Sequence, residues 1–211
     1  MAKERPQSSP AVQRSTISDF MSNVQRDFAR PNMFQVNLAF PAFFKNRGEL
    51  ARLGAFTCRA ANLPSSQIGV IEVPFRGRVL KIAGDRTFEP WTITIMNDSN
   101  FVLRSAFELW ANAIQAANEN FTAAGTLGDE SDSTGYFADM TVHQLARDLK
   151  DGDSPKVLKS YKFYNLFPSN ISAIDLDYGS NDAIEEFTVE LQVQYFQPKE
   201  RRGAKRGGRA R

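Results

Sequence analysis

The side chains that could carry acid–base or nucleophilic chemistry are few, and their spacing does not suit it. His143 is the only histidine. It falls on the polar side of an alternating stretch, with no nucleophile or carboxylate spaced to lie beside the ring. Cys58 is the only cysteine and is better interpreted as a small residue packed in a strand than as a reactive thiol.

Carboxylates occur in close pairs and in one cluster. Asp175 with Asp177, and Glu185 with Glu186, have the residue types for acid–base work, but solvated charges on a strand face are the simpler interpretation. Residues 125–135 are rich in Gly, Asp and Glu, yet they lack the glutamate that ends a calcium-binding loop. The sequence also contains no Gly-rich phosphate loop, no Ser-His-Asp order and no CxxC motif. We therefore expect no enzyme, no metal site and no cofactor.

Length and composition favour one packed domain. The chain has 211 residues, of which 42% are hydrophobic, and this is enough to bury a substantial core. No apolar run approaches the roughly 20 residues that cross a bilayer, and the first residues lack the apolar stretch of a signal peptide, so we expect no membrane anchor. A single cysteine excludes an intrachain disulfide and fits a reducing cytosol.

Charge is distributed unevenly behind a net value of +2. Residues 198–211 contain seven basic residues and one acidic residue, whereas residues 31–197 contain 14 basic and 20 acidic residues. We therefore divide the chain into an N-terminal arm (1–30), a β domain (31–197) and a basic C-terminal tail (198–211). The tail either touches DNA or a partner, or is simply solvated. Its contact residues would be Arg201, Arg202, Lys205, Arg206, Arg209 and Arg211.

Alternating apolar and polar residues predict a mainly β domain. One long helix is expected over 100–118, where apolar residues recur at steps of three and four, with Asn97, Asp98 or Ser99 as its cap. A short helix is expected in the second half of the arm, and residues 41–54 are expected to form a loop. The predicted strands cover 34–40, 56–63, 68–73, 79–83, 91–96, 136–146, 157–167, 171–178 and 187–195.

Two predicted connections have consequences for assembly. Residues 68–82 predict a hairpin that projects from the body, and such a hairpin exposes strand edges that a monomer avoids but an oligomer can use. Residues 84–90 contain Gly, Asp and Pro between two β-rich runs, which predicts a turn.

The same region carries a family resemblance. The run Ala83-Gly84-Asp85-Arg86-Thr87-Phe88, followed by Trp91-Thr92 and Met96-Asn97-Asp98, resembles the tail tube proteins of T4-like contractile-tailed bacteriophages. Residues 27–36, 56–64 and 168–187 resemble the same family, so the likeness runs from about residue 27 to 196. It implies a mainly β (α+β) fold, an antiparallel β-sandwich or open barrel with one packed α-helix.

The resemblance also implies a structural virion protein assembled in the host cytoplasm. Members form hexameric rings whose strands join across subunits, and the rings stack into a hollow tube inside a contractile sheath. The implied partners are further copies of the chain, the tail sheath protein, the baseplate and tail terminator proteins, and genomic DNA passing through the lumen. An acidic body fits that passage because a negative wall repels phosphate.

We hypothesise that the arm, the hairpin and the segment 84–88 make the contacts between subunits. Two alternative functions remain. The first is a tube-like baseplate or secretion-system protein with the same fold, and the second is a nucleic-acid-binding protein that uses the basic tail. The absence of interleaved aromatic and basic strand residues argues against the second. The proposed interface residues are Phe28, Arg30, Pro31, Phe75, Arg76, Arg78, Gly84, Asp85, Arg86 and Thr87.

Overall fold

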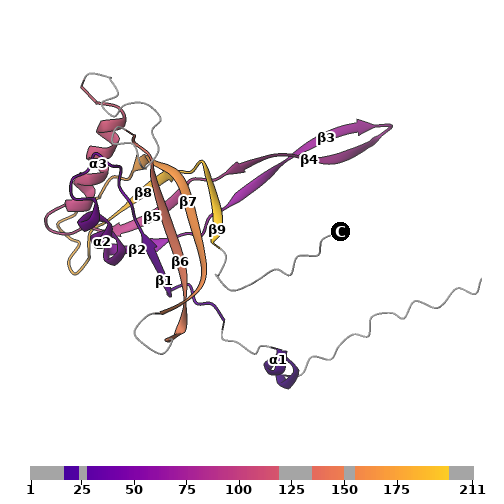
Figure 1. Ribbon diagram of the computed structural model, residues 1–211, viewed down its shortest axis with the longest axis horizontal. Helices are drawn as coiled ribbons and strands as arrows, with labels where there is room; N and C mark the ends of the chain where they lie inside the picture. The colour runs from indigo at the N-terminus through magenta and orange to yellow at the C-terminus, as the bar shows by residue number, and fades with distance from the viewer. Residues whose placement is uncertain (1–16, 24–27, 119–134, 150–154, 200–211) are drawn as a thin grey trace, which may run out of the picture.

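The computed structural model describes residues 17–23, 28–118, 135–149 and 155–199 (Figure 1). Three helices lie in these ranges: α1 (Ile17–Asn23), α2 (Arg47–Thr57) and α3 (Val102–Ile114). The strands are β1 (Phe34–Asn37), β2 (Cys58–Ala61), β3 (Ser66–Phe75), β4 (Arg78–Phe88), β5 (Trp91–Met96), β6 (Ala138–Leu149), β7 (Pro155–Ile171), β8 (Glu186–Gln192) and β9 (Tyr195–Lys199).

All strand pairings are antiparallel, and β7 organises the main sheet. The order is β1-β6-β7-β8-β5-β2, with β9 also pairing with β7, while β3 and β4 form a separate hairpin. The first part of β7 lies between β6 and β9, and its last residues pair with β8 across a bulge at Pro168. A bulge is where a central strand tolerates a proline. The mainly β fold class is thus confirmed.

The core lies between the two parts of the sheet that share β7. Trp91 of β5 stacks on Phe163 of β7 with ring centroids 4.3 Å apart, and the Trp91 indole donates a hydrogen bond to the Asn62 carbonyl. Both rings are almost completely buried. The alternation of β5 and β8 therefore buries one face of each strand, as the sequence predicts.

The long predicted helix is present as α3 and packs its apolar stripe on the core. Phe101, not one of the predicted residues 97–99, occupies the N-cap position, but Asp98 still stabilises the start of the helix because the Val102 N–H donates to its Oδ1 over 3.0 Å. Trp110 is fully buried and donates from Nε1 to the Tyr136 carbonyl. None of the described helices is long and apolar enough to cross a membrane.

The prediction of a loop over 41–54 is wrong, since α2 begins at Arg47 and lies beside α3 (Figure 1). Gly48 and Gly54 disguise this helix in the sequence, because glycine usually marks a turn. Gly54 is required here for packing: a Cβ atom at this position would lie 2.5 Å from Leu38 Cδ1. The fold therefore has two packed helices rather than one.

Three strand predictions also need correction. The segment 84–88 continues β4 instead of turning. Residues 171–178 do not form a strand of their own, because β7 ends at Ile171 and a long loop follows. The last predicted strand is interrupted at Val193 and Gln194, so that β8 and β9 pair with different parts of β7.

Candidate assembly surfaces

The β3–β4 hairpin projects far from the body (Figure 1), as predicted, and its tip has a defined turn. Arg76 and Gly77 link the paired residues Phe75 and Arg78 and have φ values of 45° and 80°. Two successive positive φ angles give the two-residue turn whose twist suits an antiparallel hairpin. The proposed interface residues Phe75, Arg76 and Arg78 therefore lie together at the exposed tip.

The two faces of the hairpin differ. Strand register places five large apolar side chains on one face, whereas the other carries the Glu72–Lys81 ion pair, 3.6 Å long, between shorter apolar residues. We call the first the apolar hairpin face. Its side chains are each between 40% and 67% exposed. It consists of Ile71, Val73, Phe75, Leu80 and Ile82.

The other proposed contact segment, 84–88, is the base of this hairpin. Gly84 lies against Gly69, so closely that a Cβ atom on Gly84 would be 3.1 Å from the Gly69 carbonyl oxygen. Phe88 packs edge-on against Phe196 of β9, with centroids 5.4 Å apart, and ties the hairpin to the body. Asp85, Arg86 and Thr87 are exposed strand residues beside this anchor.

The described part of the arm presents apolar side chains to solvent. Ile17, Phe20 and Met21 of α1 are exposed, as are the proposed interface residues that follow the helix. The end of the arm is held to the body, because the Gln144 amide donates 2.7 Å hydrogen bonds to the carbonyls of Arg30 and Met33. Phe28, Arg30 and Pro31 lie in this exposed stretch. Arg201, Arg202, Lys205, Arg206, Arg209 and Arg211 lie outside the described residues, as do residues 1–16.

A continuous polar face covers one side of β1, β6, β7 and β9. Register brings residues of one parity together across four strands. This face carries two lysines and one carboxylate, and Lys162 and Asp139 form an ion pair of 2.8 Å. Ring contacts extend it, since Tyr164 stacks on Tyr195 at 4.6 Å. We call this set the polar sheet face: Gln35, Asn37, Asp139, Thr141, His143, Ser160, Lys162, Tyr164, Tyr195, Gln197 and Lys199.

His143 lies at the centre of the polar sheet face. Its Nδ1 is 2.7 Å from the Ser160 hydroxyl and its Nε2 is 3.2 Å from the Asn37 amide nitrogen. An amide nitrogen can only donate, so Nε2 accepts and the proton is on Nδ1. Burial, and then the positive charge of Lys199, lower the pKa of His143. The ring is therefore a neutral hydrogen-bonding group on the polar side of β6, where the alternating sequence pattern places it.

The remaining candidate chemical groups have structural surroundings. Burial raises the pKa of the Cys58 thiol to about 11, which fits a packed residue rather than a reactive thiolate. Glu186 pairs with Arg59, and Glu185 accepts a hydrogen bond from the Asn97 amide. Within the described ranges, no three His, Cys, Asp or Glu side chains gather in a way that could hold a metal ion.

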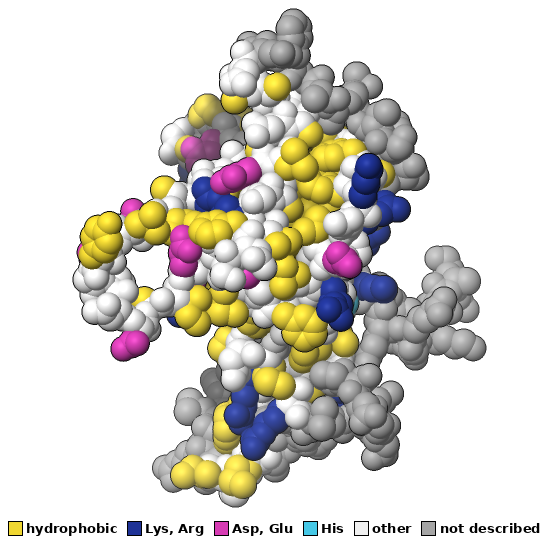
Figure 2. Space-filling view, turned by 90° about the vertical axis from the view of Figure 1, so that its left-hand side faces the viewer, with side chains coloured by type: hydrophobic (Ala, Val, Ile, Leu, Met, Phe, Trp, Pro, Cys, Tyr) yellow, Lys and Arg dark blue, Asp and Glu magenta, His cyan; other side chains and the backbone are white. Residues whose placement is uncertain are grey.

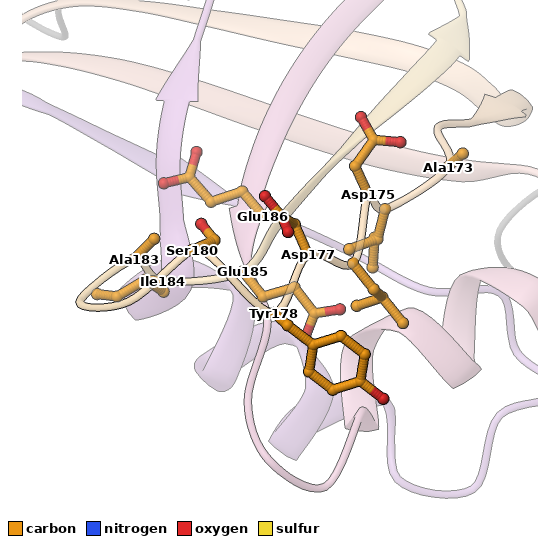
Figure 3. A pocket seen from close by; sticks show the side chains of 11 residues that line it. Ala173, Asp175, Asp177, Tyr178, Ser180, Ala183, Ile184, Glu185 and Glu186 are labelled. Atoms are coloured by element: carbon orange, nitrogen blue, oxygen red, sulfur yellow. The ribbon is translucent and has the colours of Figure 1, made fainter.

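The loop between β7 and β8 is the surface that sequence reasoning missed, because its residues read as a strand. Residues 173–186 line a cavity of about 660 Å³ with acidic and apolar side chains (Figure 3). Leu176, Tyr178 and Ile184 are largely exposed. The loop adjoins the side that carries the helices, where hydrophobic and charged side chains lie open to solvent (Figure 2).

An exposed apolar hairpin, open sheet edges and a separate polar sheet face together define a self-assembling structural protein, since a monomer would avoid the first two. Comparison with known proteins identifies its family. A family model described as "Phage tail tube protein" matches residues 29–198, so the chain belongs to the phage tail tube protein family.

Sequence relatives agree with that assignment. The chain is 34% identical over 171 residues to tail tube protein gp19 of Enterobacteria phage T4, covering 81% of this chain and 92% of the relative. It is 29% identical over 185 residues to the tail tube protein of Serratia phage KSP90, covering 87% and 96% of the two chains. The family resemblance drawn from the sequence is therefore confirmed.

Solved structures show the same fold. A chain in the anti-feeding prophage baseplate superimposes with a TM-score of 0.57 at 16% identity, covering 83% of this chain and 97% of that one. A chain in the anti-feeding prophage cap gives 0.57 at 17% identity, with coverages of 90% and 99%. At such identities the likeness concerns the fold alone.

Proposed function

We propose that copies of this chain form hexameric rings that stack into the inner tube of a contractile tail and conduct DNA from capsid to host. The observation that carries the proposal is the apolar hairpin face, whose five side chains are open to solvent in the isolated chain. Covering them on a neighbouring copy removes a contiguous apolar patch from water. In the virion we expect the tube to contact the sheath, baseplate and terminator proteins, after assembly in the host cytoplasm.

The open edges of the sheet support ring closure. Among the described strands, β1 pairs only with β6, and β9 pairs only with β7. Each therefore presents unpaired backbone groups along its outer edge. Joining β1 of one copy to β9 of the next satisfies these groups and continues one sheet around the ring.

In such a ring the polar sheet face lines the lumen. Among the described residues that define this face, the charged ones are Lys162, Lys199 and Asp139, and the His143 ring is neutral. The exposed Arg147 follows on the same side of β6. This wall is not acidic, so electrostatic repulsion does not account for the passage of DNA. We infer instead that hydrated neutral groups, which neither repel nor bind phosphate strongly, let DNA slide.

Electron microscopy of the purified protein over a concentration series tests the proposal. We expect rings or hollow tubes, with the hairpins between successive copies. Fragments of tubes from virions serve as seeds, so that slow nucleation does not hide growth. A chain that stays monomeric at high concentration, even with seeds, would overturn the proposed function.

A further inference from the structure

We propose that the loop 173–186 is a docking site for the basic residues 200–211 of a second copy of the chain. The tail of one subunit would thereby clamp another subunit in the assembly. This inference rests on the proposed function, because the assembly supplies the second copy. The tail lies outside the residues that match the family model, 29–198.

The loop is hydrogen-bonded to the body at both ends and exposes apolar side chains between them. At its start, Arg104 of α3 donates from Nη1 to the Ser172 carbonyl over 2.6 Å. At its end, the Asn97 N–H donates to the Glu185 carbonyl over 2.8 Å. Between these points Leu176 is 86% exposed and Tyr178 is completely exposed. Exposed apolar groups that lie close together on a surface are typical of an interface.

The charge of the loop specifies a cationic occupant. Residues 173–186 contain five carboxylates and no Lys or Arg. Among the described ion pairs only the one from Glu186 to Arg59 involves this loop. Asp175 and Asp177 are exposed, and Figure 3 shows their carboxylates around the cavity, with the Tyr178 ring beside it.

The chain carries a segment with the complementary composition. Residues 200–211 contain six basic residues and one acidic residue, and three of the others are glycines. An arginine places its apolar stem against leucine or tyrosine side chains while its guanidinium reaches a carboxylate. An arginine-rich segment therefore suits a cavity of mixed acidic and apolar groups better than a purely apolar or purely ionic partner does.

Geometry assigns the first arginines of the tail, Arg201 and Arg202, to the loop of a second copy. The tail follows Lys199, which pairs with Ser160 near the start of β7, whereas the loop begins beyond Ile171 at the other end of β7. The strand between these points is about 36 Å long at 3.3 Å per residue. Figure 1 places β9 on the side of the sheet away from α2 and α3, and the loop is bonded to α3. Arg201 and Arg202, directly after β9, cannot reach their own loop.

Direct binding of a labelled peptide tests the docking without requiring tubes. The probe is a labelled synthetic peptide of residues 199–211, and the target is the full chain. We expect saturable binding by fluorescence anisotropy that weakens with salt, and Asp175→Lys with Asp177→Lys should weaken it at least tenfold. The matched control, Glu49→Lys with Glu89→Lys, reverses two exposed carboxylates outside the loop and should change the affinity less than threefold. Equal affinities for loop variant and control, or binding to duplex DNA but not to the chain, would overturn the proposal.

Charge exchange in the full chain tests the clamp in the assembly. Arg201→Glu with Arg202→Glu, and separately Asp175→Lys with Asp177→Lys, should each raise the unassembled concentration about fivefold, whereas combining all four should restore it to within twofold. Failure of the combination to restore assembly, with each variant folded by circular dichroism, would contradict the docking. If the wild-type chain forms no tubes, the proposed function fails while the peptide result still decides the docking.

Cysteine crosslinking identifies which copy supplies the tail. On a Cys58→Ala background, chains with Arg202→Cys mixed with chains with Asp177→Cys should give mixed disulfide dimers under mild oxidation. A single chain carrying both cysteines that instead closes an internal disulfide would overturn the second-copy assignment.

Discussion

Assembly should depend on which face of the β3–β4 hairpin is altered. Ile71 and Leu80 belong to the apolar hairpin face and are 54% and 60% exposed. Replacing both with threonine removes apolar surface but keeps a residue that suits a strand. We expect the isolated chain to fold as before, because neither side chain belongs to the buried core.

The exposed fractions set the size of the effect. Burying a whole aliphatic side chain contributes about 2 kcal/mol, so covering the exposed parts of Ile71 and Leu80 contributes about 2 kcal/mol per copy. Each 1.4 kcal/mol corresponds to a tenfold change in an equilibrium constant. The concentration at which tubes form should therefore rise about tenfold to thirtyfold in the double variant.

A matched pair on the opposite face controls for a general loss of hydrophobicity. Val70 and Val79 are 61% and 54% exposed and lie on the face with the Glu72–Lys81 ion pair. Their replacement by threonine should shift the same concentration less than threefold, measured as protein left in solution after tubes are sedimented. An equal shift in both variants would refute the prediction that only the apolar hairpin face makes the contact. If neither variant shifts the concentration, the hairpin is not part of the assembly surface.

Three further substitutions test the body of the protein. Trp110→Ala removes a fully buried ring and its hydrogen bond to Tyr136, and should lower the free energy of unfolding by about 3–5 kcal/mol in urea denaturation. Gly84→Val places a side chain against the Gly69 backbone, so tube formation should weaken while the melting temperature of the monomer changes little. Burial lowers the pKa of His143, so below pH 6.5 the unfolded chain binds a proton before the folded chain does. The stability that neutral His143 contributes is therefore present above pH 6.5 and is lost as the pH falls, and the melting-temperature advantage of wild type over His143→Gln should shrink from pH 7.5 to pH 5.

Strict alternation made the half-buried strands predictable. In β5 and β8 every second residue is an apolar residue that is buried, and the residues between are not buried, so the period of two in the sequence reports directly on the structure. The helix α3 was predictable for a similar reason, because its apolar residues recur at steps of three and four. The hairpin was predictable because turn residues separate two β-rich runs. Residues 83–88, 91–92 and 96–98, which carry the family resemblance, lie in or next to these elements.

Elements whose conformation depends on distant partners were not predictable. The helix α2 buries only Leu50 and Gly54, so its sequence has almost no helical periodicity. Gly54 does not mark a turn: it leaves room for the side chain of Leu38, which follows β1. The strand β4 continues through Gly84 because Gly69 of β3 lies opposite. Residues 171–178 alternate like a strand, but no partner strand pairs with the loop in the part of the chain that the structure describes.

The polar sheet face shows most clearly what strand parity alone cannot predict. Parity along one strand places His143 among polar residues, but only register across β1, β6 and β7 brings Asn37 and Ser160 to its two ring nitrogens. The same register leaves this face nearly neutral, while five carboxylates gather in the loop 173–186. Five of the 20 acidic residues of the domain thus lie away from the surface that would line the lumen, at a place where a basic tail could dock. Net charge is a sum over the chain, so it cannot tell whether the carboxylates would line the lumen and repel DNA or would lie at a contact between subunits. That distinction requires the position of each carboxylate in the fold.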